Sequence, residues 1–253
     1  MSQPRPRVQT VPEPAAHKST AQNSAGENSQ QSVRTEAAAS AAPTRGRYSG
    51  FRGARFLLAA PDQSFLPEDD LPEIAFVGRS NAGKSSAINR LTDHRSLARV
   101  SRTPGRTQQL IAFDLGNPTF ARLIDLPGYG FAKVPLSERK RWEQAIGGYL
   151  RNRTNLRGLV LVMDIRHAWT PLDQRLVGWL EDSDRPTAIH LLLTKADKLS
   201  RNQAQRALME TAKRVEADGI AASLQTFSAQ SGAGREDLEH LLLDWVETPS
   251  AGT

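Results

Sequence analysis

From Phe51 onward, short apolar runs alternate with longer segments whose apolar positions have helical spacing. The apolar runs predict strands at residues 73–78, 108–115, 120–125, 158–164, 188–194 and 224–228. The segments between and after them predict helices at residues 84–92, 137–152, 172–182, 202–217 and 235–247. This alternation is typical of an α/β fold, in which helices cover both faces of a mostly parallel sheet.

The second and third predicted strands differ from the others because a tight turn, Gly-Asn-Pro at residues 116–118, joins them. A connection this short allows only antiparallel pairing. We therefore expect a six-stranded sheet that is mostly parallel and has one antiparallel strand at an edge.

The N-terminal segment has a different composition from the rest of the chain. Residues 1 to about 48 are rich in Ala, Ser, Gln, Pro and Thr and show no apolar period, which predicts a disordered tail. An organelle transit peptide is the alternative, although Glu13, Glu27 and Glu36 interrupt the required pattern. The expected organisation is a tail at 1–50, one domain at 51–248 and a flexible C-terminus at 249–253.

Composition narrows the class of protein. The 253 residues carry a net charge of +6, and the sequence pI near 10.0 suggests a polyanionic partner, with nucleic acid as the first candidate. The chain has no cysteine, which excludes disulfides, thiolate metal sites and a cysteine nucleophile. Its apolar runs are far shorter than the roughly 20 residues of a membrane span. We expect a soluble, cytoplasmic monomer with no membrane partner.

The segment "GRSNAGKSSA" at residues 78–87 follows a predicted strand and precedes a predicted helix. The phosphate-loop pattern is matched by Gly78, Gly83, Lys84 and Ser85, and it lies between a strand and a helix, as a phosphate loop must. The alternative, a glycine-bearing turn with an incidental lysine, would not need a strand before it and a helix after it. Backbone N–H groups and the positive end of the helix would converge on phosphate oxygens. Lys84 would reach the β- and γ-phosphates, and the Ser85 hydroxyl would bind Mg²⁺. This loop alone separates neither ATP from GTP nor a hydrolase from a kinase.

Two later motifs bear on the identity of the nucleotide. In "DLPG", Asp125 ends a predicted strand and suits a water-mediated contact to Mg²⁺, while the Gly128 N–H can reach a γ-phosphate. In "TKAD", the Asp197 carboxylate can accept hydrogen bonds from the N1–H and N2–H₂ groups of guanine, which adenine lacks. In isolation, Lys195 and Asp197 would more often be a solvated pair at a strand end. Together with the phosphate loop, they favour a guanine nucleotide.

The chain resembles a known family of GTP-binding proteins. "GRSNAGKSS", "SRTPGRTQ", "IDLPGYGFAKV", "DIRH", "TKADKLS" and "FSAQSG" occur in an order that resembles the EngB/YihA type of ribosome-biogenesis GTPase over about residues 54–247. The resemblance implies a Ras-like P-loop domain that binds GTP or GDP with Mg²⁺ and serves large ribosomal subunit assembly. In bacteria it also implies a need for the protein in normal division and septation.

The resemblance also implies a set of site residues. Ser85 and Thr107 would be the direct Mg²⁺ ligands, with Asp125 acting through water. Thr107 has the hydroxyl that a first switch loop needs, and Pro104 and Gly105 suit a hinge, although a plain surface threonine is the alternative. The expected nucleotide contacts are Gly78, Arg79, Ser80, Asn81, Ala82, Gly83, Lys84, Ser85, Gly105, Arg106, Thr107, Gln108, Gln109, Asp125, Leu126, Pro127, Gly128, Thr194, Lys195, Ala196, Asp197, Phe227, Ser228 and Ala229.

The position after Gly128 predicts slow hydrolysis. Many GTPases have a glutamine there to orient the attacking water, whereas this chain has Tyr129. Catalysis would then depend on Lys84, Thr107 and Asn81, with Asn81 as a candidate K⁺ ligand by analogy with cation-activated GTPases. Activation by an RNA or protein partner, or by another residue of the chain, is the alternative.

Two basic clusters are candidates for contact with ribosomal RNA, and ordinary solvated surface is the alternative. They comprise Arg99, Arg102 and Arg106 in the first, and Arg139, Lys140, Arg141, Arg151, Arg153 and Arg157 in the second. Two other functions stay open: a nucleotide-gated protein of the division machinery with incidental hydrolysis, and a small-molecule P-loop kinase. The "TKAD" motif counts against the kinase.

Overall fold

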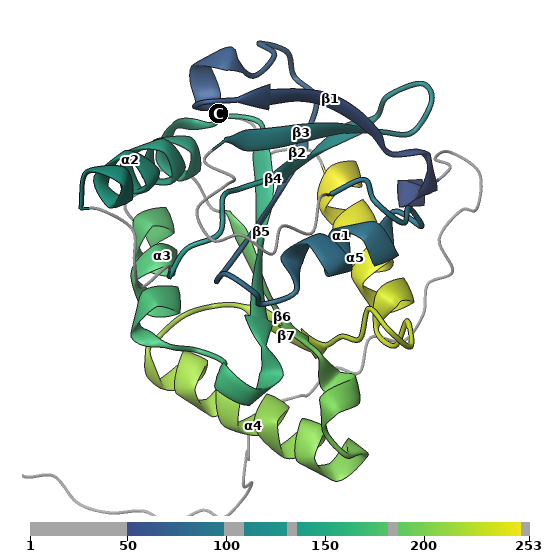
Figure 1. The fold of residues 1–253 in the computed structure, drawn as a ribbon, viewed down its shortest axis with the longest axis vertical. Coiled ribbons are helices and arrows are strands. Elements are labelled where there is room, and N and C mark those ends of the chain that lie inside the picture. The colour runs from purple at the N-terminus through teal and green to yellow at the C-terminus, as the bar shows by residue number, and fades with distance from the viewer. Residues whose placement is uncertain (1–49, 99–108, 131–135, 182–186, 249–253) are drawn as a thin grey trace, which may run out of the picture. The chain divides into compact units, whose positions relative to one another are not determined.

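A computed structural model describes residues 50–98, 109–130, 136–181 and 187–248 (Figure 1). The predicted tail and C-terminus therefore lie outside the described residues, apart from the tail's last residue, Gly50. The α-helices are α1 (Lys84–Leu91), α2 (Leu136–Asn152), α3 (Pro171–Glu181), α4 (Arg201–Ala217) and α5 (Arg235–Glu247). The 3₁₀ turns are η1 (Gly50–Gly53), η2 (Gln63–Phe65), η3 (Ile165–His167) and η4 (Ala196–Lys198).

The sheet has seven strands in the order β1-β3-β4-β2-β5-β6-β7. They are β1 (Arg55–Ala60), β2 (Glu73–Gly78), β3 (Leu110–Leu115), β4 (Ala121–Asp125), β5 (Leu156–Asp164), β6 (Ala188–Thr194) and β7 (Ser223–Thr226). β3 pairs antiparallel with both β1 and β4, and all other pairings are parallel. The α/β class and the β3–β4 hairpin are confirmed, with the antiparallel pairings confined to one edge.

The predicted count of six strands is wrong because β1 was not expected. Its sequence, "RFLLAA", contains no β-branched residue, and most of its positions are exposed or half-buried. Strand formation there depends on backbone pairing with β3, whose residues lie about fifty positions later. Local propensity does not report such a long-range interaction.

Helices pack on both faces of the sheet, with α1 and α5 on one side and α2, α3 and α4 on the other (Figure 1). β2 shows how the sequence supplies both layers. Ile74 and Phe76 join the core beneath α1 and α5, while Ala75 and Val77 join the core beneath the other three helices. This follows from the alternation of side chains along a strand. No helix in the described ranges is long and apolar enough to cross a membrane.

A buried ion pair joins the start of β2 to the chain just after α2. The Arg153 guanidinium donates to both carboxylate oxygens of Glu73, at 3.0 and 2.6 Å, and the Tyr149 hydroxyl donates to the same carboxylate at 2.9 Å. The Arg153 side chain is only 11% exposed and that of Glu73 is fully buried. The prediction that Arg153 belongs to a surface cluster is therefore wrong, because its guanidinium is bonded to a buried carboxylate.

His190 in β6 is expected to make the free energy of unfolding depend on pH. The His190 side chain is buried, and its Nδ1 atom lies 2.8 Å from the Ser223 hydroxyl oxygen. Burial lowers the pKa of His190 to about 4. Since the unfolded pKa is about 6.5, the unfolded chain binds the proton more readily, so stability falls as pH drops from about 6.5 through 4. The full loss is about 3 kcal/mol, from about 1.4 kcal/mol per pKa unit.

Urea denaturation at several pH values between 7 and 4.5 tests this expectation. The free energy of unfolding should fall more steeply with acid in the natural chain than in His190→Asn, whose amide does not titrate. Parallel curves for the two proteins would show that His190 is not the titrating group.

Candidate functional site

The phosphate loop links the end of β2 to the start of α1, and its glycines are required by close contacts. A Cβ on Gly78 would lie 2.4 Å from the Val162 carbonyl oxygen, a backbone atom that cannot move aside. Gly83 has φ +100°, and a Cβ there would also lie 3.3 Å from the Thr194 hydroxyl. The loop therefore needs glycine at both positions, as the phosphate-loop pattern predicts.

Lys84 and Asp125 meet at the edge of the sheet formed by the carboxyl ends of the parallel strands. Lys84 begins α1, Asp125 ends β4, and the Lys84 ammonium forms an ion pair with the Asp125 carboxylate. Burial raises the pKa of Asp125, and the Lys84 charge opposes that rise. A cation and a carboxylate thus lie together beside the phosphate loop, where a nucleoside triphosphate and its metal would bind.

The donors beside the loop fit Mg²⁺. The Ser85 hydroxyl and the Asp125 carboxylate are hard oxygen donors of the kind Mg²⁺ selects. In the described part of the chain, no three His, Cys, Asp or Glu side chains gather to hold a metal. A Mg²⁺ ion at this position would take its remaining ligands from phosphates and water, as is usual in nucleotide sites.

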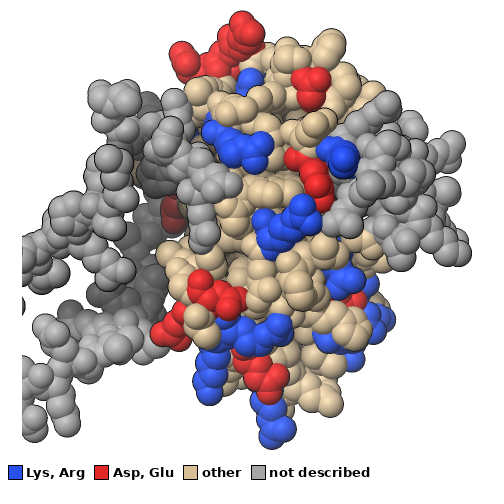
Figure 2. All heavy atoms as spheres, turned by 90° about the vertical axis from the view of Figure 1, so that its left-hand side faces the viewer, with Lys and Arg blue, Asp and Glu red and all other residues tan. Residues whose placement is uncertain are grey.

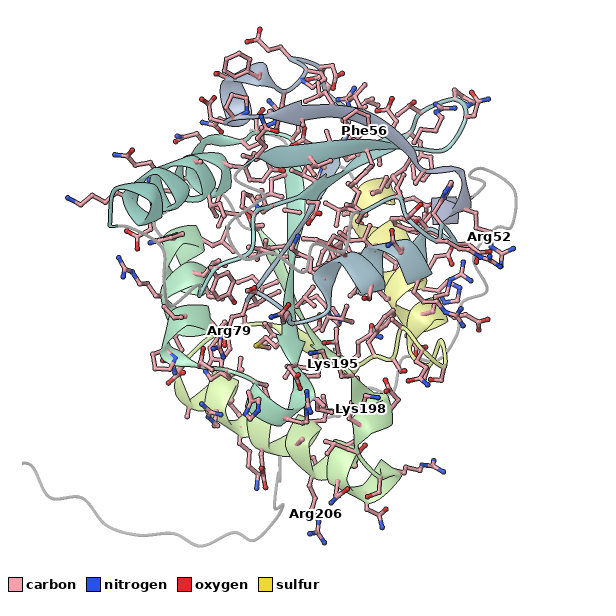
Figure 3. All side chains as sticks on the ribbon, in the orientation of Figure 1. Arg52, Phe56, Arg79, Lys195, Lys198 and Arg206 are labelled. Atoms are coloured by element: carbon pink, nitrogen blue, oxygen red, sulfur yellow. The ribbon has the colours of Figure 1, made fainter. Side chains whose placement is uncertain are left out.

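The "TKAD" loop is fastened to the phosphate loop. The Thr194 hydroxyl donates to the Met163 carbonyl at 2.9 Å and also contacts the Ala82 carbonyl. The Lys195 ammonium donates to the Asn81 carbonyl at 2.6 Å, and in Figure 3 Lys195 lies beside the ends of the central strands. These bonds therefore hold two segments side by side that are more than a hundred residues apart in the sequence.

Asp197 has a half-buried side chain, 19% exposed, that a neighbouring hydroxyl orients. Its Oδ1 accepts a hydrogen bond of 2.7 Å from the Ser228 hydroxyl, and this bond is the main cause that lowers the pKa of the carboxyl group. Lys198 approaches Oδ2 at 3.4 Å. The Ala196 N–H donates to the Phe227 carbonyl at 3.1 Å, which brings the "TKAD" and "FSA" loops together as predicted. A charged acceptor is thus presented to any base bound there.

Sequence reasoning missed Asp164, which ends β5 within "DIRH". Its carboxylate accepts hydrogen bonds from Arg166 at 2.9 and 2.6 Å and pairs with the Lys195 ammonium at 3.0 Å. Arg166 is the main cause that holds the pKa of Asp164 well below its ordinary value. Asp164 could have been predicted as a site residue from its position at the end of a strand, which is how Asp125 was identified.

The Tyr129 side chain is buried and directed toward α3. The side chain is 4% exposed, and its hydroxyl donates to the buried carboxylate of Asp173 in α3. Burial first, and then Asp173, raise the pKa of Tyr129 well above 10. The phenol therefore stays protonated at neutral pH and cannot act there as a base.

Several predicted residues cannot be placed. Gly105, Arg106, Thr107 and Gln108 lie outside the described residues, so the first switch and the Thr107 ligand stay predictions. Arg99 and Arg102 lie outside as well, as do the side chains of Arg139 and Arg141. On the side that carries α2 and α3, Lys and Arg are scattered among Asp and Glu (Figure 2).

Comparisons with known proteins agree with this geometry. The sequence model of a family described as "50S ribosome-binding GTPase" matches residues 73–195. A "Probable GTP-binding protein EngB" from Aromatoleum aromaticum is 50% identical over 200 residues, covering 79% of this chain and 91% of the relative. A protein of the same name from Coxiella burnetii is 47% identical over 198 residues, covering 78% and 95%.

Solved structures support the same fold. The crystal structure of a probable GTP-binding protein engB matches with a TM-score of 0.54 and 26% identity, covering 69% of this chain and 98% of that one. Era, solved in complex with MgGDPNP and nucleotides of 16S ribosomal RNA, matches with a TM-score of 0.54, covering 73% of this chain and 59% of that one. At 19% identity, the Era match concerns the fold alone. The predicted Ras-like P-loop GTPase fold is confirmed.

Proposed function

This chain belongs to the EngB family of GTP-binding proteins, and from that premise we propose that it is a nucleotide-dependent switch in large ribosomal subunit assembly. In this proposal it binds GTP or GDP with Mg²⁺ and hydrolyses GTP slowly. It works as a cytoplasmic monomer and, in bacteria, supports normal division and septation.

One observation carries the choice of a guanine nucleotide. The half-buried carboxylate of Asp197, oriented by Ser228, belongs to the same loop as Lys195, whose ammonium donates to the Asn81 carbonyl in the phosphate loop. A base held at Asp197 would therefore leave its phosphates next to Lys84 and Ser85. A carboxylate pairs with the two adjacent donors of guanine and with nothing comparable on adenine.

The chain's own groups divide the work at the phosphates. Lys84 would bind the β- and γ-phosphate oxygens, and backbone N–H groups of the phosphate loop would donate to the same oxygens. Ser85, Thr107 and a water on Asp125 would hold Mg²⁺, which when bound neutralises the charge that develops during phosphoryl transfer. Gly128 would donate its N–H to the γ-phosphate and so distinguish GTP from GDP.

Slow hydrolysis follows from Tyr129, since its buried phenol offers no group to the attacking water.

Asn81 has an exposed side chain and a left-handed backbone with φ 63°, and we propose it as the ligand of an activating K⁺ ion. GTP turnover is expected to be about tenfold faster in K⁺ than in Na⁺ at equal ionic strength, which corresponds to about 1.4 kcal/mol of barrier.

Phosphate release assayed in both salts tests the cation. Asn81→Gly removes the side chain while keeping the backbone conformation accessible, and it should lose the difference between the salts. Equal turnover in K⁺ and Na⁺ would refute the K⁺ site and leave activation to an RNA or protein partner.

Two observations support a ribosomal partner: the net charge of +6, and the match to a family described as ribosome-binding GTPases. The test is co-sedimentation of the chain with purified large ribosomal subunits, in GDP and in a non-hydrolysable GTP analogue. We expect retention on the subunit with the analogue and release with GDP. Absence from the subunit fraction with both nucleotides would contradict the ribosomal role and favour a partner in the division machinery.

A further inference from the structure

Tyr129 is held at three points, which is unexpected for a residue that follows the γ-phosphate-binding glycine. Its backbone N–H donates to the Gly78 carbonyl at 3.2 Å, and its carbonyl accepts from the Ser80 N–H at 2.8 Å. These bonds attach the turn to the phosphate loop. The third point is the side chain, whose hydroxyl donates to Asp173 and attaches the turn to α3.

Asp173 is fully buried and forms the start of α3. It is the third helical residue, and its Oδ2 accepts from the backbone N–H and the hydroxyl of Thr170 at 2.6 and 2.8 Å. Its Oδ1 accepts from Tyr129. A carboxylate near a helix N-terminus is stabilised by the unpaired N–H groups there. One side chain therefore fixes the first turn of α3 and the turn after Gly128 together.

The phosphate loop and α3 are both in van der Waals contact with the turn after Gly128. A Cβ on Gly130 would lie 3.5 Å from both Arg79 Nε and Leu172 Cδ1, so the phosphate loop and α3 flank the turn closely. Arg79, labelled in Figure 3, reaches from the phosphate loop toward α3. A Cβ on Gly128 would lie 3.4 Å from the Gly78 carbonyl oxygen. Because Gly128 directly precedes Tyr129, a movement of Gly128 toward a phosphate would act on the Tyr129–Asp173 bond.

We propose that Asp173, acting through the Tyr129 hydroxyl, is a positioning residue for Gly128 and transmits the nucleotide state to the first turn of α3. This inference rests on the proposed function, because it requires Gly128 to contact the γ-phosphate. The state-dependent surface would then include the start of α3, where Leu172 is 38% exposed. Where other GTPases have a glutamine, this chain thus has a tyrosine whose hydroxyl bonds the turn after Gly128 to α3.

Tyr129→Phe tests the link because it removes one hydroxyl and keeps the ring. The variant should lower the affinity for a non-hydrolysable GTP analogue relative to GDP by about tenfold, within the usual range of couplings between sites. Tyr149→Phe is the matched control, since Tyr149 is also buried and also donates to a buried carboxylate, Glu73, but at the other end of the sheet. It should change the ratio of the two affinities by less than about twofold.

Asp173→Asn and the double variant give an independent check. If both residues act through one bond, the double variant should shift the affinity ratio no further than Tyr129→Phe alone. Amide hydrogen exchange at residues 172–176 should also differ between the analogue and GDP in the natural chain and lose that difference in Tyr129→Phe.

The outcomes separate this inference from the function on which it rests. Equal losses for both nucleotides, an equal ratio change in Tyr149→Phe, or unchanged exchange in α3 would overturn the link while guanine binding stands. Failure of the natural chain to bind either nucleotide would overturn the proposed function, and the link with it.

Discussion

Asn in place of Asp197 is expected to lower the affinity for GDP by about 10²- to 10⁴-fold and to shift preference toward xanthosine diphosphate. The carboxylate would accept two hydrogen bonds from guanine, each worth about 1.5–3 kcal/mol because the acceptor is charged. The amide replaces one of these acceptor atoms with a donor that faces a donor of guanine. Xanthine carries an oxygen at that position, so it would accept the bond that guanine opposes.

Competition titrations of GDP and xanthosine diphosphate against a fluorescent nucleotide measure this change. Ser228→Ala should have a smaller effect, about tenfold, because the carboxylate remains and loses only the 2.7 Å bond that orients it. Asp93→Asn, at an exposed turn after α1, serves as a charge-matched control and should bind GDP normally. A variant at Asp197 that kept full preference for GDP would show that this residue does not read the base.

The largest stability effect is expected from Arg153→Met, at about 3–5 kcal/mol. The substitution removes the two bonds that Arg153 donates to Glu73 and leaves a carboxylate with a fully buried side chain beside Tyr149 alone. Removing one partner of a buried ion pair is costly because the other charge is left without compensation. The pair lies at the start of β2, opposite the phosphate loop at its end, so the folded variant should still bind GDP.

Urea denaturation of three variants measures the effect. Arg166→Met removes an arginine that is 44% exposed and bonded to Asp164, so it should cost no more than about 1 kcal/mol. Combining Arg153→Met with Glu73→Leu should recover much of the loss, since no charge then remains buried. If Arg153→Met cost as little as Arg166→Met, the pair would not be a stabilising element of the core.

Sequence reasoning succeeded where a few consecutive residues determine the local structure. The phosphate loop is one such case, because its glycine pattern is read from consecutive residues, and the structure leaves no room for a Cβ at Gly78 and has a left-handed backbone at Gly83. The pairing of Asp197 with Ser228 was not predicted, although both loops were expected at the site. The two loops were expected to lie together because each follows a predicted strand, and the structure places these strands, β6 and β7, side by side and parallel.

The remainder depends on contacts between distant positions. Tyr129 and Asp173 are 44 residues apart, and Glu73 and Arg153 are 80 apart. Nothing in either segment alone indicates its partner, and for Arg153 the neighbouring arginines suggested a surface instead. Strand β1 was missed for the same reason, since it depends on pairing with β3.

Equilibrium titration of the chain with fluorescent GDP and fluorescent ADP, in the presence of Mg²⁺, tests the central claim most directly. The site predicts that GDP binds at least about a hundredfold more tightly than ADP, because only guanine supplies the two donors that Asp197 can accept. Equal affinities for the two nucleotides, or tighter binding of ADP, would contradict a guanine-specific switch.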